Sequence, residues 1–335
     1  MTTPSQVDSD TAVDALLDPR HFTRYRIILR QAYPQTVVTH STVTLSLFLV
    51  NEVGLYRHDD HHVNLMCRVF RGDATLEQYP LNGVSGFYHS GKGGVQLCLK
   101  GTGQVYVWIG GQEINDKMDI VPLVIGPIAL VPSVPDSEPP VLDNNMYRSV
   151  SVRDRHVMVQ EFWDAGIPGK VWDSALDIAN YIARQCENDD AWLNEGDHVI
   201  DLSAGTGLLG LVVAAGAPHA HVTLTEVPEA LNTLRHNAAL NPDLSVSIQA
   251  LEWANPQHMN ALQRSNLVLA SDLFYENDYI PALMATLHHL GPPIWIGYKQ
   301  RGLTAAEQDA MWQQLYSNYT VTSTPLPHTT LYRLT

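Results

Sequence analysis

A glycine-rich segment in the second half of the chain has the residue types that hold a nucleoside. The sequence HVIDLSAGTGLLG places an apolar run, His198–Leu202, directly before small residues and an apolar helical pattern. Such a strand-to-helix turn presents backbone N–H groups and a helix N-terminus to a ligand. Gly205, Gly207 and Gly210 have the spacing of the G-x-G-x-x-G fingerprint. Glu226 follows 21 residues after the first of these glycines, where a carboxylate can bond both hydroxyls of a ribose.

Two ligand classes fit this turn: a dinucleotide, as in an oxidoreductase, and a nucleoside without a pyrophosphate. Asp201, four residues before Gly205, would repel phosphates and attract an ammonium or sulfonium group. Acids and aromatic residues also follow later strand-like runs, notably Trp253, Asp272 and Tyr275. These positions favour a positively charged nucleoside ligand and place the dehydrogenase interpretation last.

Further motifs extend in order along residues 157–335. They are Gln160 with Gly169-Lys170-Val171-Trp172-Asp173-Ser174-Ala175, Asp201-Leu202-Ser203-Ala204-Gly205-Thr206-Gly207, Thr225-Glu226-Val227-Pro228-Glu229-Ala230-Leu231, Asn237 and Asn241, Leu251-Glu252-Trp253, Asp272-Leu273-Phe274-Tyr275, and Tyr298-Lys299-Gln300-Arg301. Together they resemble the seven-strand, S-adenosylmethionine-dependent methyltransferases of family 16, the protein-lysine methyltransferases related to nicotinamide N-methyltransferase. Two positions depart from the family pattern: Ser203 stands where the loop has glycine, and Glu226 where aspartate is usual.

The resemblance implies S-adenosylmethionine as cofactor, a lysine-bearing protein as substrate, and a set of site residues. The implied cofactor-binding residues are Trp172, Asp201, Ser203, Gly205, Gly207, Glu226, Trp253 and Ser271. The implied catalytic residues are Asp272, which can accept a hydrogen bond from the amine, and Tyr275, which can offer an aromatic face or a hydroxyl. Methyl transfer to an amine requires no metal, so we expect none.

The elements that position these residues alternate between strand and helix. We expect strands at 198–202, 221–225, 245–250, 266–270 and 294–298, with helices at 173–185, 208–215, 228–240 and 280–290 between them. Thr304 and Glu307 predict a capping box for a last helix, before two strands at 320–324 and 329–334. This order predicts an α/β fold with a doubly wound, seven-stranded, Rossmann-like methyltransferase sheet.

The sequence pattern of the first half differs from that of the second, because most of its apolar runs are strand-like. We expect a short helix at 19–32, strands at 36–50 and 63–70, and a hairpin of 95–100 with 104–109 around Gly101-Thr102-Gly103. A proline-rich stretch at 131–140 is typical of a linker. We therefore predict a β-rich domain of unknown role at 1–140 and a methyltransferase domain at 141–335.

Composition limits the partners. The 335 residues have a formal net charge of −15; residues 1–150 carry 11 basic and 15 acidic side chains, and residues 151–335 carry 9 and 20. This balance argues against nucleic acid as a partner and suits a cationic one in the second half. The longest apolar run, 120–131, is too short for a bilayer, which needs about 20 residues, so we expect no membrane association. The sequence leaves the oligomeric state open.

The cysteines and the N-terminus bear on the compartment. Cys67, Cys98 and Cys186 are widely spaced, which is typical of reduced intracellular cysteines, and the N-terminus is polar without a secretory apolar region. We expect a cytoplasmic protein and leave nuclear access open.

Two features of the first half suggest other chemistry. His58-Asp59-Asp60-His61-His62 suggests a metal site, but consecutive residues do not easily converge on one ion. Ser90-Gly91-Lys92-Gly93-Gly94 lacks the spacing of a phosphate-binding loop. The functions that stay open beside protein-lysine methylation are small-molecule N-methylation and a non-catalytic cofactor-binding module.

Overall fold

The computed structural model describes residues 24–57, 62–71, 74–80, 86–89, 91–111, 119–134, 139–187 and 192–335. It divides the described chain into two compact units, residues 24–149 and residues 150–335. The division falls at 149/150, whereas the sequence places a boundary at 140/141, and strand β13 (Met146–Val152) runs across it. Most of the His58–His62 cluster, Ser90 and part of the proline-rich stretch lie outside the described residues.

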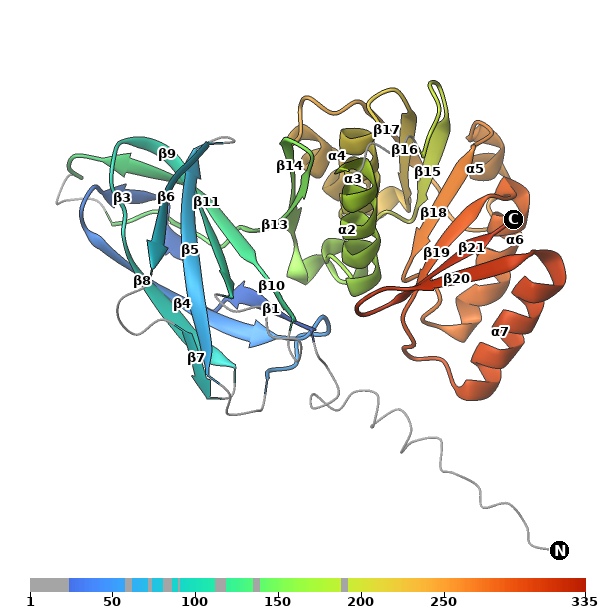
Figure 1. The fold of residues 1–335 in the computed structure, drawn as a ribbon, viewed down its shortest axis with the longest axis horizontal. Helices are drawn as coiled ribbons and strands as arrows, with labels where there is room; N and C mark the ends of the chain where they lie inside the picture. The colour runs from blue at the N-terminus through green and yellow to red at the C-terminus, as the bar shows by residue number, and fades with distance from the viewer. Residues whose placement is uncertain are drawn as a thin grey trace, which may run out of the picture. The chain divides into compact units, whose positions relative to one another are not determined.

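The first unit is built from strands (Figure 1). They are β1 (Arg24–Leu29), β2 (Tyr33–Pro34), β3 (Thr36–Val38), β4 (Thr42–Val50), β5 (Val63–Arg71), β6 (Ala74–Pro80), β7 (Gly86–His89), β8 (Lys92–Cys98), β9 (Gly103–Gly111), β10 (Asp119–Val121), β11 (Leu123–Val131) and β12 (Leu142–Asp143). The main sheet, which also includes β14 (Arg155–Glu161), has the order β10-β1-β4-β8-β7-β5-β9-β11-β13-β14, with β3 and β6 paired off this path.

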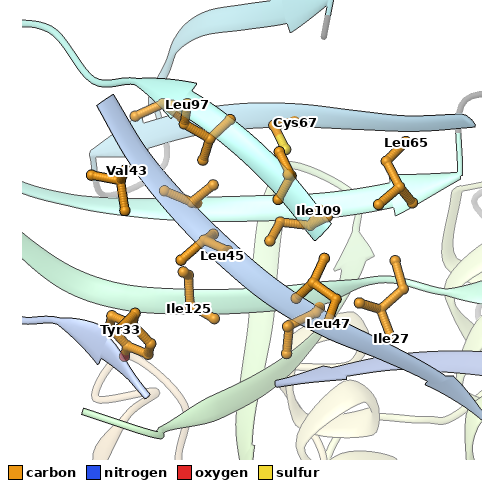
Figure 2. Packing of buried hydrophobic residues seen from close by; sticks show 14 of the residues in the cluster. Ile27, Tyr33, Val43, Leu45, Leu47, Leu65, Cys67, Leu97, Ile109 and Ile125 are labelled. Carbon is orange, nitrogen blue, oxygen red and sulfur yellow. The ribbon is translucent and has the colours of Figure 1, made fainter. Parts of the chain in front are cut away.

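One apolar core fills this unit. Alternate residues of β4, such as Leu45 and Leu47, point into it, as period-2 strands require. Figure 2 shows these side chains meeting Ile27, Ile109 and Ile125 from β1, β9 and β11. Because strands from distant places in the sheet share this cluster, the sheet folds back on itself around a closed core.

Two expectations for this unit are wrong. Residues 24–29 of the expected helix form strand β1, with Tyr25 and Ile27 buried on one face; residues 19–23 lie outside the description. Strands β8 and β9 exist but do not pair as a hairpin, because β8 lies between β4 and β7 while β9 lies between β5 and β11. Other strands occupy both edges of β8 and of β9, so the glycine-rich turn only connects the two.

The second unit alternates strand and helix. Its elements are β14 (Arg155–Glu161), η2 (Trp163–Ala165), η3 (Ile167–Gly169), α2 (Asp173–Glu187), β15 (His198–Leu202), α3 (Leu208–Gly216), β16 (His221–Glu226), η4 (Pro228–Ala230), α4 (Leu231–Ala239), β17 (Val246–Ala250), α5 (Pro256–Ala261), β18 (Leu267–Ser271), η5 (Asn277–Tyr279), α6 (Ile280–Leu290), β19 (Ile294–Tyr298), α7 (Ala305–Asn318), β20 (Val321–Pro325) and β21 (Thr330–Leu334). The seven-stranded sheet has the order β17-β16-β15-β18-β19-β21-β20, and β21 is antiparallel to both neighbours. The predicted doubly wound sheet is confirmed.

Helices cover both faces of this sheet (Figure 1). Helix α3 is buried along its whole length, and a Cβ on Gly210 would lie 2.2 Å from Leu224 of β16. Helices α6 and α7 pack their apolar residues, including Leu283 and Met311, on the other face. The predicted capping box of Thr304 and Glu307 starts α7. Within the described residues, no helix has the length and apolar character that crossing a bilayer demands.

Candidate active site

The site forms where the parallel strands β15, β16, β17 and β18 end. The carboxyl ends of parallel strands meet at one edge of a sheet, and ligands of such sheets bind there. A cavity of about 500 Å³ lies along this edge. Of the predicted cofactor residues, those that line the cavity are Trp172, Ser203, Gly205, Glu226, Trp253 and Ser271. Both predicted catalytic residues, Asp272 and Tyr275, line it as well.

The glycine loop uses left-handed backbone at Ser203, Gly205 and Gly207, with φ of 53°, 56° and 82°. Glycine adopts this region without strain, and Gly207 caps helix α3 there. Ser203 adopts it as a non-glycine residue, and its Oγ accepts a hydrogen bond of 2.9 Å from the Trp253 indole. The hydroxyl thus ties the loop after β15 to the loop after β17, a bond that the usual glycine has no side chain to make.

Glu226 ends strand β16 and faces the glycine loop. Its carboxylate accepts hydrogen bonds from the backbone N–H of Gly205 at 3.3 Å and of Val227 at 3.2 Å. Burial raises the pKa of Glu226, and these two N–H donors oppose the rise. A buried carboxylate at this place can accept hydrogen bonds from the hydroxyl groups of a ribose.

Two predicted cofactor residues, Asp201 and Gly207, do not line the cavity. The Asp201 carboxylate is 1% exposed and accepts a 2.8 Å hydrogen bond from the backbone N–H of Gly210. Its other oxygen, Oδ1, has no hydrogen-bond partner within the described part of the chain. Burial raises the pKa of Asp201 to about 7, against the Gly210 hydrogen bond, and the nearby Glu226 adds to the rise.

Asp272 follows β18 and is held from two sides. Ser174, at the start of α2, donates to it from its backbone N–H at 2.8 Å and from its hydroxyl at 2.6 Å. The Arg301 guanidinium lies 2.9 Å from Oδ1 and 5.0 Å from the centre of the Trp172 ring. The backbone of Asp272 is left-handed, with φ of 57°. These contacts fix the carboxylate, and they join the wall of the cavity formed by Trp172 to the wall formed by β18.

Aromatic rings form the side of the cavity beyond Asp272. Tyr279 lies edge-on to Tyr275, with ring centres 6.2 Å apart, and to Trp253, with ring centres 6.3 Å apart. Burial raises the pKa of Tyr275, and Tyr279 and Glu276 raise it further. Its hydroxyl is therefore neutral near pH 7 and can donate a hydrogen bond.

The structure adds site residues to which the sequence interpretation gives no role. Ser174 and Arg301 hold Asp272, while Tyr279 and Lys170 line the cavity. Tyr279 ends η5, whereas Tyr275 precedes this element and Glu276 between them is extended, so no helical spacing in the sequence predicts that the two rings meet. In the described part of the chain, no group of three or more His, Cys, Asp or Glu side chains could hold a metal ion.

A family model described as a lysine methyltransferase matches residues 152–315. The match covers just under half of the chain, and this segment is similar to that lysine methyltransferase family. The matched range contains the glycine loop, Glu226, Trp253 and Asp272, so it covers most of the cavity. The resemblance to family 16 is confirmed.

Curated lysine methyltransferases match part of the chain. EEF1A lysine methyltransferase 3 of Mus musculus is 35% identical over 147 residues, which are 42% of this chain and 60% of that protein. Protein N-lysine methyltransferase METTL21A of Xenopus tropicalis is 32% identical over 142 residues, 41% of this chain and 62% of that protein. The chain thus spans about 60% of the length of these curated relatives.

A solved structure of magnesium protoporphyrin IX methyltransferase from Synechocystis, with S-adenosylhomocysteine bound, matches 48% of this chain and 82% of that chain at 11% identity and a TM-score of 0.35.

Proposed function

We propose that the unit of residues 150–335 transfers a methyl group from S-adenosylmethionine to the side-chain amine of a lysine in a protein substrate. The observation that carries the proposal is that one cavity of about 500 Å³ brings the glycine loop, Glu226 and Trp253 together with Asp272 and Tyr275. Nucleoside-binding groups and amine-orienting groups therefore share one space within a segment similar to the lysine methyltransferase family.

The residues present fit the cofactor. Gly205 lines the cavity with a φ of 56°, a backbone conformation that glycine adopts without strain, and a Cβ there would lie 3.3 Å from the carbonyl oxygen of Pro168. Glu226 would accept hydrogen bonds from the ribose hydroxyls, and Trp253 would flank the adenine. When bound, S-adenosylmethionine supplies a methyl group on a positively charged sulfur for displacement by an amine lone pair.

The chain must orient a neutral amine. A lysine amine has an ordinary pKa of about 10.4. Enclosure in the cavity and a nearby positive charge lower this pKa and release the lone pair. Asp272, fixed by Ser174 and Arg301, would accept a hydrogen bond from the amine, and the Tyr275 ring would line its path.

The rim of the cavity supports a protein substrate over a small molecule. Three apolar residues that line it are unusually exposed: Ile167 at 52%, Tyr279 at 47% and Val227 at 37%. Exposed apolar side chains around a cavity are typical of a surface that another protein covers. The net charge of −11 over residues 151–335 also favours a lysine-bearing protein over nucleic acid or an anionic membrane.

The proposal extends to the compartment. Cys67, Cys98 and Cys186 are free thiols, which suits a reducing environment. We therefore keep the cytoplasm as the proposed location, with the nucleus open.

The test incubates the full chain with tritiated S-adenosylmethionine and a cell extract, then separates protein from small molecules. We expect label in discrete protein bands and about a hundredfold less with Asp272→Asn, at unchanged cofactor affinity by calorimetry. Asparagine suits this control because it tolerates the left-handed backbone of Asp272.

Two results would contradict the proposal. Label confined to small molecules would make the protein a small-molecule N-methyltransferase. Cofactor binding without any transferred label would make it a non-catalytic binding module.

A further inference from the structure

The exposed apolar side chains of the second unit gather at the mouth of the cavity. In the described part of residues 150–335, four large apolar side chains are exposed, and three of them, Ile167, Val227 and Tyr279, line this cavity. They come from three separate segments: η3, the loop after β16, and the end of η5. Three loops thus each contribute one exposed apolar side chain to a single opening, and we call these three residues the rim.

The rim side chains are exposed, but the backbone and rings that carry them are held in place. The carbonyl of Ile167 accepts a hydrogen bond of 2.9 Å from the Trp172 indole, and the carbonyl of Val227 accepts one of 3.0 Å from the N–H of Ala230. The Tyr279 ring has the two aromatic contacts described above. Side chains on a fixed backbone lose little further freedom when a partner covers them. The rim therefore suits contact with the surface of another protein.

Exposed carboxylates accompany the rim and define the charge of its partner. The segment that ends in Tyr279 carries two of them, η4, which Val227 precedes, carries a third, and a fourth lines the cavity itself. These exposed acids are Glu276, Asp278, Glu229 and Glu252. An acidic residue thus lies within two positions of two of the three rim side chains.

The segments around the opening contain far more acids than cations. Residues 164–172, 226–230, 251–255 and 271–280 together contain seven Asp or Glu and one cationic residue, Lys170. The Lys170 ammonium lies 4.4 Å from the centre of the Trp163 ring. One carboxylate, that of Asp272, suffices to orient a single amine inside the cavity. The exposed acids beside the rim stand where the surface around that amine would rest.

We propose that the rim binds a basic protein surface, on which the target lysine is accompanied by further lysine or arginine side chains and by an apolar residue. The inference rests on the proposed function and names the kind of surface that the methyltransferase takes. Complementary charge increases the rate of association and excludes acidic surfaces, which the rim acids repel. The apolar contacts with the rim then hold the bound surface in place.

The first test is the surroundings of the lysines that the full chain methylates in a cell extract, located by mass spectrometry. We expect lysine and arginine to outnumber acids within about 10 Å of each methylated side chain, the distance over which exposed charges act at moderate salt. The exposed lysines of the same proteins that stay unmethylated are the comparison, and they should show no such excess.

The second test uses the labelled protein, purified from the extract, as the substrate. Glu276→Gln/Asp278→Asn should lower kcat/KM by about three- to tenfold through a higher KM, at unchanged cofactor affinity by calorimetry. The difference from wild type should shrink between about 50 mM and about 300 mM NaCl, because salt screens exposed charges. Glu195→Gln/Asp243→Asn makes the same charge change at exposed positions before β15 and β17, at the opposite edge of the sheet, and should behave as wild type.

A third variant separates the apolar contact from the charges. Ile167→Ser removes an exposed apolar side chain and leaves the carbonyl that accepts from Trp172. It should lower kcat/KM by about threefold or more at both salt concentrations, because apolar contact is not screened by salt.

Three results would overturn the proposal. In the first, methylated lysines have no more basic surroundings than the unmethylated ones. In the second, Glu276→Gln/Asp278→Asn has the kcat/KM of wild type at low salt. In the third, the control pair at the opposite edge lowers kcat/KM as much, which would make the effect one of total charge. A full chain that methylates no lysine at all would instead overturn the proposed function, so the two failures are distinguishable.

Discussion

Asp201 shows how a motif residue can act from outside the cavity. The sequence places it four residues before the first glycine of the loop, which suggests direct contact with a cationic ligand. In the structure, its carboxylate lies between β15 and the first turn of α3, bonded to the Gly210 N–H. It therefore holds the start of α3, the helix that follows the glycine loop. Asp201 does not line the cavity, so its charge acts on a bound ligand only by long-range electrostatics.

Burial of Asp201 predicts a pH dependence of stability. Its pKa is about 7 in the folded chain and about 3.9 when unfolded, so the folded state holds more protons between these values. The free energy of unfolding should fall as pH rises from about 4 to 7. Asp201→Asn keeps an acceptor for the Gly210 N–H and removes the charge. We expect it to stabilise the protein at pH 8 by on the order of 1–4 kcal/mol and to flatten this pH dependence.

Calorimetric unfolding at pH 5 and pH 8 measures this effect. Glu229→Gln, at an exposed acid of the same unit, is the matched control and should not change the free energy of unfolding at pH 5 or at pH 8. An Asp201→Asn protein that is less stable than wild type at pH 8 would contradict the argument.

Among the elements, β14 is bonded along its backbone by the side chains of two asparagines, Asn237 of α4 and Asn241 just after this helix. The Asn237 side chain accepts from the Gln160 N–H at 2.8 Å and donates to the carbonyl of Thr206 at 2.8 Å. Asn241 bonds the N–H and carbonyl of Met158 in the same manner, at 3.0 Å and 2.8 Å. These side chains act as a strand edge for β14 and connect it to the glycine loop through Thr206.

Asn237→Ala should therefore destabilise the second unit. It leaves the Gln160 N–H and the Thr206 carbonyl buried without this hydrogen-bond partner. Each such group lowers the free energy of unfolding by about 1–3 kcal/mol. We expect the unfolding midpoint to fall by roughly 5–15 °C. Cofactor affinity should also fall, because Thr206 lines the cavity. Asn232→Ala, on the exposed side of α4, should leave the unfolding midpoint and the cofactor affinity unchanged. If Asn237→Ala and Asn232→Ala had equal effects, Asn237 would not hold β14 and the glycine loop as described.

The sequence predicts the second unit far better than the first, and the reason is the range of the contacts. Strands β15 and β19 and helix α6 have the predicted bounds, because short buried strands between capped helices are recognisable locally. The six-residue helix α5 is too short to leave a periodic signal. In the first unit, β8 pairs with β4, which lies far earlier in the chain, and not with β9, and no local turn pattern reveals this choice.

The candidate site could be predicted as a set of residues but not as an arrangement. Order along the chain indicates which residues follow a strand, so Glu226, Trp253 and Asp272 could be named from sequence. It contains no sign that Ser174 holds Asp272, because 98 residues separate them. It also does not distinguish Asp201, which is enclosed, from Glu226, which lines the cavity.

At the scale of the whole molecule, the two units raise the question of which functions each performs. All residues of the cavity belong to residues 150–335, and a separate apolar core fills the β-rich unit. Strand β13 crosses the division and leads into β14, so a cut at residue 149 would divide a strand. A fragment of residues 144–335 keeps the β13–β14 pair.

We expect this fragment to bind S-adenosylmethionine with the affinity of the full chain, within about twofold, since no cavity residue is removed. If the β-rich unit contributes to substrate recognition, labelling of the protein substrate should fall while cofactor affinity stays. Calorimetry and the tritium assay measure the two effects separately. A fragment that folds by circular dichroism but does not bind the cofactor would contradict the assignment of the site to one unit.

The proposed activity is the methylation of a lysine side chain of a protein by the residues of this cavity. The most direct test is mass spectrometry of the proteins labelled by the full chain from deuterated S-adenosylmethionine in a cell extract, with Asp272→Asn in parallel. We predict deuterated methyl groups on the side-chain nitrogen of a lysine in a discrete protein, lost with Asp272→Asn. Deuterated methyl on another residue type, or equal labelling by both proteins, would contradict the account.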